Sequence, residues 1–170
     1  SVTIPDSVTS IGDSAFPPRT IVYRHFKVPA GTTTITDDSW VGWGVEKETL
    51  KQVIIPSSVT SIGDEVFWGC SSLVTVTILG NVTIIGNSAF RECSSLKNVK
   101  IPSSLTSIGQ YAFKDCSSLV TITIPDRVTS IGDEVFYRCS SLVTVTILGN
   151  VTSIGDEVFY GCSSLENVEI

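Results

Sequence analysis

Short runs of apolar residues alternate with polar residues along this chain and return at a fixed interval. In the segment 75–78, two threonines alternate with Val76 and Ile78. Period-two alternation of β-branched and polar residues predicts a short, half-buried strand. A second extended piece follows each strand and is closed by a glycine. An Asp, Asn or Gln comes next, and because Asp and Asn are good helix N-caps, we expect a short helical turn that carries a phenylalanine and a cysteine.

The pattern repeats every 23 residues, as the cysteines show: Cys70, Cys93, Cys116, Cys139 and Cys162. Phenylalanines, glycines and leucines keep the same step. A unit of this length cannot bury its own apolar face, so successive units must stack as the coils of a solenoid. Strands of neighbouring coils then pair in parallel, about 4.8 Å apart. The sequence therefore predicts an α/β repeat solenoid, elongated and curved, with one parallel sheet on its concave side and short helical turns on its outer side.

The regular 23-residue repeats occupy residues 50–170, whereas residues 1–49 keep the repeat in degraded form with insertions. The prolines that mark the strand ends there, Pro5, Pro29 and Pro56, are 24 and 27 residues apart. Seven units and the first strand of an eighth can be counted. We expect one solenoid domain over 1–170 that is a fragment of a longer chain, because open ends would expose apolar core and unpaired strand edges.

The unit L-x-x-V-x-I-P-x-x-V-T-S-I-G-x-x-A/V-F-x-x-C resembles the BspA-like leucine-rich repeats, also called the Treponema pallidum type. The resemblance is clean over residues 50–170 and degraded over 1–49. The segment I-G-x-x-A-F-x-x-C distinguishes this class from other leucine-rich repeats. The resemblance implies a right-handed leucine-rich-repeat horseshoe. It also implies a surface or secreted protein of bacteria, protists or algae that acts in adhesion or protein binding and has no catalytic motif.

Charge and composition argue against several classes of function. The formal net charge of −6 and the pI of 4.6 disfavour nucleic acid, whose phosphates require a basic face. No apolar run reaches the roughly eighteen residues of a membrane span, so we expect no membrane insertion within this segment. There is one histidine, His25, and no C-x-x-C pair. We therefore expect no enzyme activity, no metal site and no cofactor.

The five cysteines are expected to form one column of parallel side chains. A disulfide needs converging Cβ vectors, which such a column does not supply. The odd number of cysteines would also leave at least one thiol unpaired. We expect buried, free thiols, since small apolar packing is a common role for cysteine.

Outward positions of the predicted concave sheet form the first candidate binding surface. They are mostly threonine and valine, with one basic row and one acidic end, and solenoids often bind proteins through such a face. The alternative interpretation is that threonine and valine simply suit strands. The candidate residues are Thr75, Thr77, Lys97, Asn98, Lys100, Thr121, Thr123, Thr144 and Thr146.

The irregular N-terminal repeats form the second candidate surface, with Tyr23, Arg24 and Trp43 as its candidate residues. Tyrosine, arginine and tryptophan are the residues that interfaces favour. The alternative is a decayed repeat that packs its own aromatic rings, with Trp40 and Trp43 at positions that elsewhere hold the core phenylalanine and cysteine.

Two N-x-T sequons, at Asn81 and Asn150, occupy the same position of the repeat. Both are candidate glycosylation sites if the chain enters a eukaryotic secretory pathway. The alternative is that the turn favours asparagine and the repeat favours threonine, with no modification.

These observations favour a non-enzymatic recognition or adhesion module that binds a protein or a glycan partner. The partner would bind the concave face or the irregular N-terminal repeats. An extracellular or cell-surface location is favoured. The alternative is a structural scaffold subunit held inside a large multiprotein assembly, in the cytoplasm or an organelle.

Overall fold

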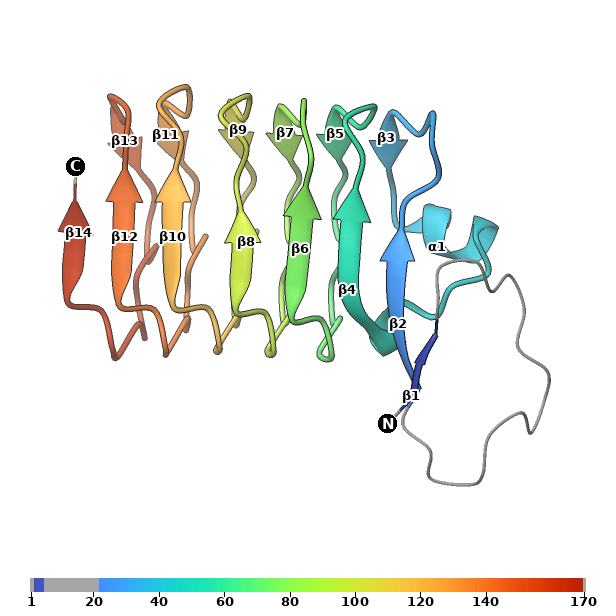
Figure 1. Ribbon diagram of the computed structural model, residues 1–170. Helices are drawn as coiled ribbons and strands as arrows, with labels where there is room; N and C mark the ends of the chain where they lie inside the picture. The colour runs from blue at the N-terminus through green and yellow to red at the C-terminus, as the bar shows by residue number, and fades with distance from the viewer. Residues whose placement is uncertain (1, 5–21, 170) are drawn as a thin grey trace.

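The computed structural model describes residues 2–4 and 22–169 as one stack of coils (Figure 1). Each regular coil contributes one longer strand and one two-residue strand. The longer strands are β1 (Val2–Ile4), β2 (Val22–Lys27), β4 (Leu50–Ile55), β6 (Thr75–Ile78), β8 (Asn98–Lys100), β10 (Thr121–Ile124), β12 (Thr144–Ile147) and β14 (Asn167–Glu169). The two-residue strands are β3 (Thr34–Ile35), β5 (Ser61–Ile62), β7 (Ile84–Ile85), β9 (Ser107–Ile108), β11 (Ser130–Ile131) and β13 (Ser153–Ile154).

The pairing of strands is parallel throughout the described part of the chain and follows the 23-residue step. Thr75 lies opposite Asn98, and Thr121 lies opposite Thr144. The predicted parallel solenoid is therefore confirmed. Between β2 and β4 the register shifts at Arg24/His25, where the degenerate repeats meet the regular ones.

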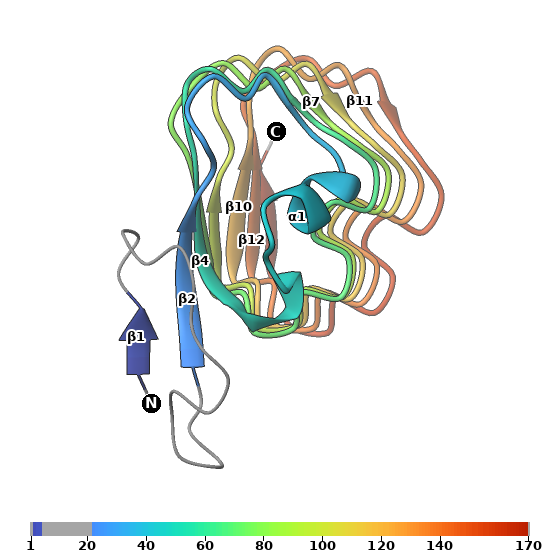
Figure 2. The same ribbon diagram turned by 90° about the vertical axis from the view of Figure 1, so that its right-hand side faces the viewer.

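The core is built from columns in which each residue packs on its equivalent in the next coil. The rings of five successive phenylalanines stack with centroids 4.8–5.9 Å apart and interplanar angles of 4–12°. Four of them, Phe67, Phe90, Phe113 and Phe136, are fully buried. Seen down the stack, the long strands lie on one side of the coils (Figure 2). A single coil could not bury its phenylalanine, so each ring is covered by the rings of the neighbouring coils.

The short helical turns expected after each glycine are not confirmed in the regular repeats. Two positions of that segment have left-handed backbone in successive coils. One of these positions holds Glu92 (φ 61°) in one coil and Asp115 (φ 59°) in the next. Alternate amides there bond to the next coil, as where the Phe90 N–H donates to the Ala112 carbonyl at 2.8 Å. A helix would need those amides for bonds within its own coil. Helix in the described residues is limited to α1 (Asp38–Gly42) and the 3₁₀ turn η1 (Lys47–Thr49).

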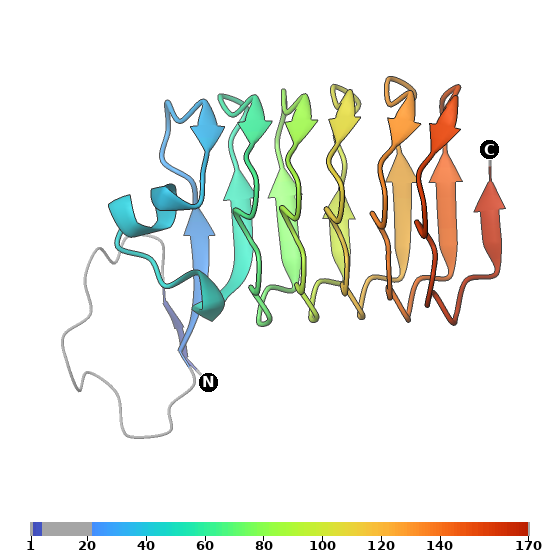
Figure 3. The same cartoon turned by 180° about the vertical axis from the view of Figure 1, so that it is seen from behind.

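The expected single sheet is interrupted, which corrects the sequence-based prediction. Long strands β1, β2, β4, β6 and β8 form one sheet, and β10, β12 and β14 form another. The two-residue strands separate at the same coil, with β3, β5, β7 and β9 in one sheet and β11 and β13 in another. The wider step between β8 and β10 is visible from the front (Figure 1) and from behind, between the yellow and orange coils (Figure 3).

Candidate functional site

The long strands carry their outward side chains on one common side, here called the long-strand face. All nine candidate residues of the predicted concave sheet lie on it. Thr75, Thr77, Thr144 and Thr146 are half-buried between closely paired neighbours. The other five are exposed and flank the interruption between β8 and β10: Lys97, Asn98, Lys100, Thr121 and Thr123.

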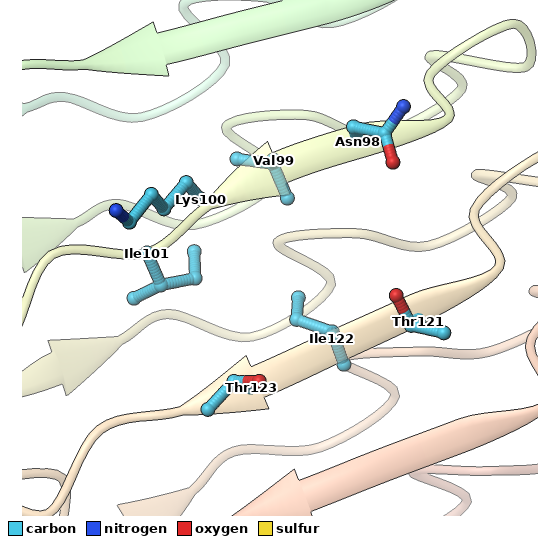
Figure 4. A pocket seen from close by; sticks show the side chains of 7 residues that line it. All are labelled: Asn98, Val99, Lys100, Ile101, Thr121, Ile122 and Thr123. Atoms are coloured by element: carbon cyan, nitrogen blue, oxygen red, sulfur yellow. The ribbon is translucent and has the colours of Figure 1, made fainter.

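A groove of about 390 Å³ lies at this interruption (Figure 4). Ile101 and Ile122 lie between the two strands in that view. Val99 and Ile122 are almost fully buried, at 8% and 3% exposure, and form an apolar floor. The groove is lined by Asn98, Val99, Lys100, Ile101, Thr121, Ile122 and Thr123.

One set of backbone hydrogen bonds is missing at the groove, although it joins all the other neighbouring pairs of regular coils. At the start of each long strand, an N–H donates to the carbonyl of the preceding coil, as from Val143 to Val120 at 2.8 Å. The same bond recurs from Lys97 to Val74 at 3.0 Å. Within residues 22–169, no such bond joins Val120 to the Lys97 carbonyl. The groove therefore exposes unpaired backbone groups on two facing strand edges.

Gln110 accounts for the interruption. In other coils this position is Asp or Asn, whose side-chain oxygen accepts the next coil's backbone N–H: Asn87 to Asp64 at 2.7 Å, and Asp156 to Asp133 at 3.0 Å. Gln110 is one methylene longer, and its amide instead donates to the Asp133 carboxylate at 3.1 Å. The longer side chain thus acts as a spacer between these two coils.

A proline removes one further hydrogen bond at the same contact. After β6 and β12 the chain continues with a leucine whose N–H donates to the preceding coil, as from Leu148 to the Ile124 carbonyl at 3.0 Å. After β10 the corresponding residue is Pro125, which has no N–H to offer to Ile101. Pro56 and Pro102 occupy the same position after β4 and β8, and both of those strands still pair with the strand before them. The missing N–H of Pro125 therefore removes one bond but does not by itself open the gap.

The two coils stay joined on the turn side, away from the long strands. The Phe113 N–H donates to the Val135 carbonyl at 2.9 Å. The Lys114 ammonium lies 2.5 Å from the Glu134 carboxylate and 4.3 Å from the Tyr137 ring centroid. The coils are therefore separated on the strand side and remain in contact on the turn side.

The groove has a local positive charge in an acidic protein. Lys97 and Lys100 are both exposed, and neither has an ion-pair partner within residues 25–169. The protein as a whole carries a net charge of −6. This concentration of positive charge makes the groove attractive to carboxylates.

The second candidate surface is described only in part. Tyr23 and Arg24 lie in β2, but their side chains are outside the described part of the chain. Trp43 is half-buried and packs 5.4 Å from Phe26 and 5.3 Å from Trp40, centroid to centroid. These contacts favour the interpretation that the degenerate repeat packs its own aromatic rings.

Trp40 continues the phenylalanine column at its N-terminal end. Its ring lies 5.2 Å from Phe67, and its indole Nε1 donates to the buried Val66 carbonyl at 2.6 Å. Helix α1, which carries it, lies across the end of the coils (Figure 2). The expectation that Trp40 replaces a core phenylalanine is confirmed.

The cysteine column is buried and unpaired, as the sequence predicts, except that Cys162 is half-exposed. Each of four thiols donates to the phenylalanine carbonyl of the preceding coil at 3.1 Å, as from Cys116 to Phe90. Burial raises the pKa of Cys93, Cys116 and Cys139 well above the ordinary thiol value. These thiols are packing groups and not nucleophiles.

The two sequon asparagines are exposed. The Asn81 amide nitrogen donates to the Ser57 carbonyl at 3.1 Å, so it already has a structural role in the turn. Glycosylation of Asn81 and Asn150 stays a prediction.

Four of the seven residues that line the groove are candidates from the sequence, but the groove itself is not predicted by it. A signal was present in the sequence, because Gln110 departs from an Asp/Asn column. In the described residues, no three His, Cys, Asp or Glu side chains gather in an arrangement suited to a metal ion. None of the described helices has the length and apolar character needed to cross a membrane.

Solved structures of similar proteins share the fold. A leucine-rich repeat protein of T. pallidum is 36% identical, with a TM-score of 0.67, over 69% of this chain and 57% of that one. A leucine-rich cell surface protein of Faecalibacterium prausnitzii is 28% identical, with a TM-score of 0.60, over 98% of this chain and 46% of that one. A leucine-rich repeat protein of Bacteroides ovatus is 26% identical, with a TM-score of 0.58, over 98% and 60%.

The chain therefore spans 46–60% of the length of these solved relatives. No curated protein matches it. The model of the BspA type leucine-rich repeat region matches residues 1–93 and 45–166, with six copies. With its 23-residue coils, buried phenylalanine and cysteine columns and parallel long strands, the chain belongs to the BspA-type leucine-rich repeat family.

Proposed function

We propose that this protein is a non-enzymatic recognition module that binds a protein partner through its long-strand face. The proposal rests on one observation: five exposed residues surround a groove in which backbone groups lack hydrogen-bond partners. Two of these residues are lysines without an ion-pair partner in the described chain. Rigid stacked coils hold these groups in fixed positions, so a partner is bound without the cost of ordering a loop.

A protein partner fits this face better than a glycan. Sugar rings are commonly held against exposed aromatic side chains through their apolar faces. The outward positions of β4–β14 carry no aromatic residue in the described chain. The exposed rings Trp68 and Tyr160 belong to the turn side. Free strand edges, in contrast, match the backbone of another polypeptide.

The proposed location is the cell surface or the extracellular medium. The support is the F. prausnitzii relative, which is described as a cell surface protein. A role as a scaffold subunit inside a large assembly is the competing outcome of the test below.

The test compares two surface variants for binding to an array of extracellular proteins and glycans. Thr121→Glu/Thr123→Glu changes the long-strand face, and Glu65→Gln/Tyr160→Ser changes the turn side. We expect a protein ligand whose binding is lost in the first variant and kept in the second. Equal binding by both variants would refute the role of the long-strand face. Recovery of the native protein only in a fixed assembly would favour the scaffold role.

A further inference from the structure

We propose that the groove between β8 and β10 accepts an extended acidic peptide segment, which adds there as a parallel strand. The proposal rests on the proposed function, because it names the class of partner for the same face. It concerns the one place in the described stack of regular coils where the hydrogen bonding between long strands is broken.

The first argument is backbone chemistry. An unpaired strand edge is a template for another strand, and most folds cover such edges. Here two edges face each other across a 390 Å³ groove. A strand placed between them would pair on both sides, with β8 and with β10. It occupies about 4.8 Å of sheet, so its insertion widens the strand side while the turn-side bonds act as a hinge.

The second argument is the pattern of side chains that the groove presents. Val99, Ile101 and Ile122 form its apolar floor, whereas Lys100 and Thr123 stand at its rim. Alternate residues of an inserted strand point inward and outward. The occupant must therefore alternate apolar residues, which cover the floor, with acidic residues, which lie between Lys100 and Thr123.

The chain itself contains a segment with these properties. Residues 164–170 read S-L-E-N-V-E-I, and residues 95–101 read S-L-K-N-V-K-I. Residues Asn167–Glu169 of the acidic segment form β14, which pairs in parallel with β12. In that pair the Thr146 hydroxyl donates to the Glu169 carboxylate at 3.3 Å. A glutamate in the groove would meet the equivalent Thr123 on one side and the Lys100 ammonium on the other.

Gln110 controls access to the site. Asparagine at this position would accept the Asp133 N–H, as Asn87 accepts the Gln110 N–H at 3.0 Å. The coils would then close and the strand edges would pair with each other. Gln110→Asn thus removes the groove without altering any residue that lines it.

The experiment uses two synthetic heptapeptides that differ only in charge, Ser-Leu-Glu-Asn-Val-Glu-Ile and Ser-Leu-Lys-Asn-Val-Lys-Ile. Hydrogen exchange of the full 170-residue chain is followed by mass spectrometry with each peptide. We expect the acidic peptide to slow exchange in residues 97–101 and 120–124. The basic peptide should leave both segments unchanged. Lys97→Gln/Lys100→Gln should weaken acidic-peptide binding roughly twofold to thirtyfold, the size expected for loss of two exposed ion pairs.

Gln110→Asn should reduce binding at least about tenfold, because each 1.4 kcal/mol lost is a factor of ten. Asp64→Asn, at the same repeat position in a closed part of the stack, should bind like the parent protein. Equal protection by both peptides would overturn the proposal. So would exchange of the Val120 amide in the free protein as slow as that of the Val143 amide, which is bonded to the preceding coil, because this would indicate a closed groove. If the acidic peptide gives no protection while Thr121→Glu/Thr123→Glu still abolishes binding of a protein ligand, this inference fails and the proposed function stands.

Discussion

Gly→Ala substitutions at equivalent positions test the spacing between coils, because each adds one methyl group against the preceding coil. A Cβ at Gly109 would lie 2.5 Å from the Asn87 nitrogen and 2.6 Å from the Gly86 carbonyl carbon. A Cβ at Gly132 would meet nothing nearer than the Gln110 Cγ and nitrogen, at 3.4 Å. Neither glycine has left-handed backbone. The two positions therefore differ in the space that the preceding coil leaves.

Gly109→Ala should destabilise the protein by about 1–3 kcal/mol, the usual cost of overpacking against backbone that cannot move. Gly132→Ala should be neutral or stabilise by up to about 1 kcal/mol, because alanine restricts the unfolded chain where the native backbone tolerates it. The two variants should therefore differ by roughly 1–4 kcal/mol in free energy of unfolding, measured by urea denaturation. Equal destabilisation by both substitutions would refute the separation of these coils.

The double variant Gln110→Asn/Gly132→Ala supplies the matching control. Asparagine at 110 recreates the surroundings that Asn87 gives Gly109. In that background the alanine at 132 should become costly, with a coupling of about 1–3 kcal/mol between the two sites. Additive effects would show that Gln110 is not the spacer.

Three further predictions concern the core. Phe113→Ala should cost about 3–5 kcal/mol, because the ring is fully buried and stacks on rings in both neighbouring coils, and calorimetry checks it. Trp40→Phe should cost about 1–3 kcal/mol in urea denaturation, since the buried Val66 carbonyl loses its indole donor. Burial raises the pKa of Cys93, Cys116 and Cys139, so these thiols stay protonated in the folded protein. In the unfolded chain, cysteine thiols ionise at about pH 8.5. Stability should thus be constant below about pH 8.5 and fall above it by about 1.4 kcal/mol per pH unit and thiol, and a flat profile to about pH 10 in urea titrations would contradict this.

Most of the architecture could be predicted from the sequence because each coil repeats the same solution. The 23-residue step of cysteine and phenylalanine determines which residues stack, and stacking determines the parallel pairing of strands. The alternation at Thr75–Ile78 was enough to place the strand and its outward face. These are local patterns, and their consequences follow from period and burial alone.

The turn conformation could not be predicted in the same way. Asp64 and its equivalents read as helix N-caps, but their side chains accept amides of the next coil. The backbone that follows is left-handed at Glu92 and Asp115, which local propensity disfavours. Bonds between coils outweigh that preference, and those bonds exist only once the coils are stacked.

The repeat, the core columns and the residues of the long-strand face can all be read from the sequence. The division of this face between Lys100 and Thr123 arises only when the coils are stacked. The added methylene of Gln110 acts across the contact between two coils, where Pro125 also lacks an N–H. Such effects are small in either coil alone and change the sheet only when one coil is laid against the next.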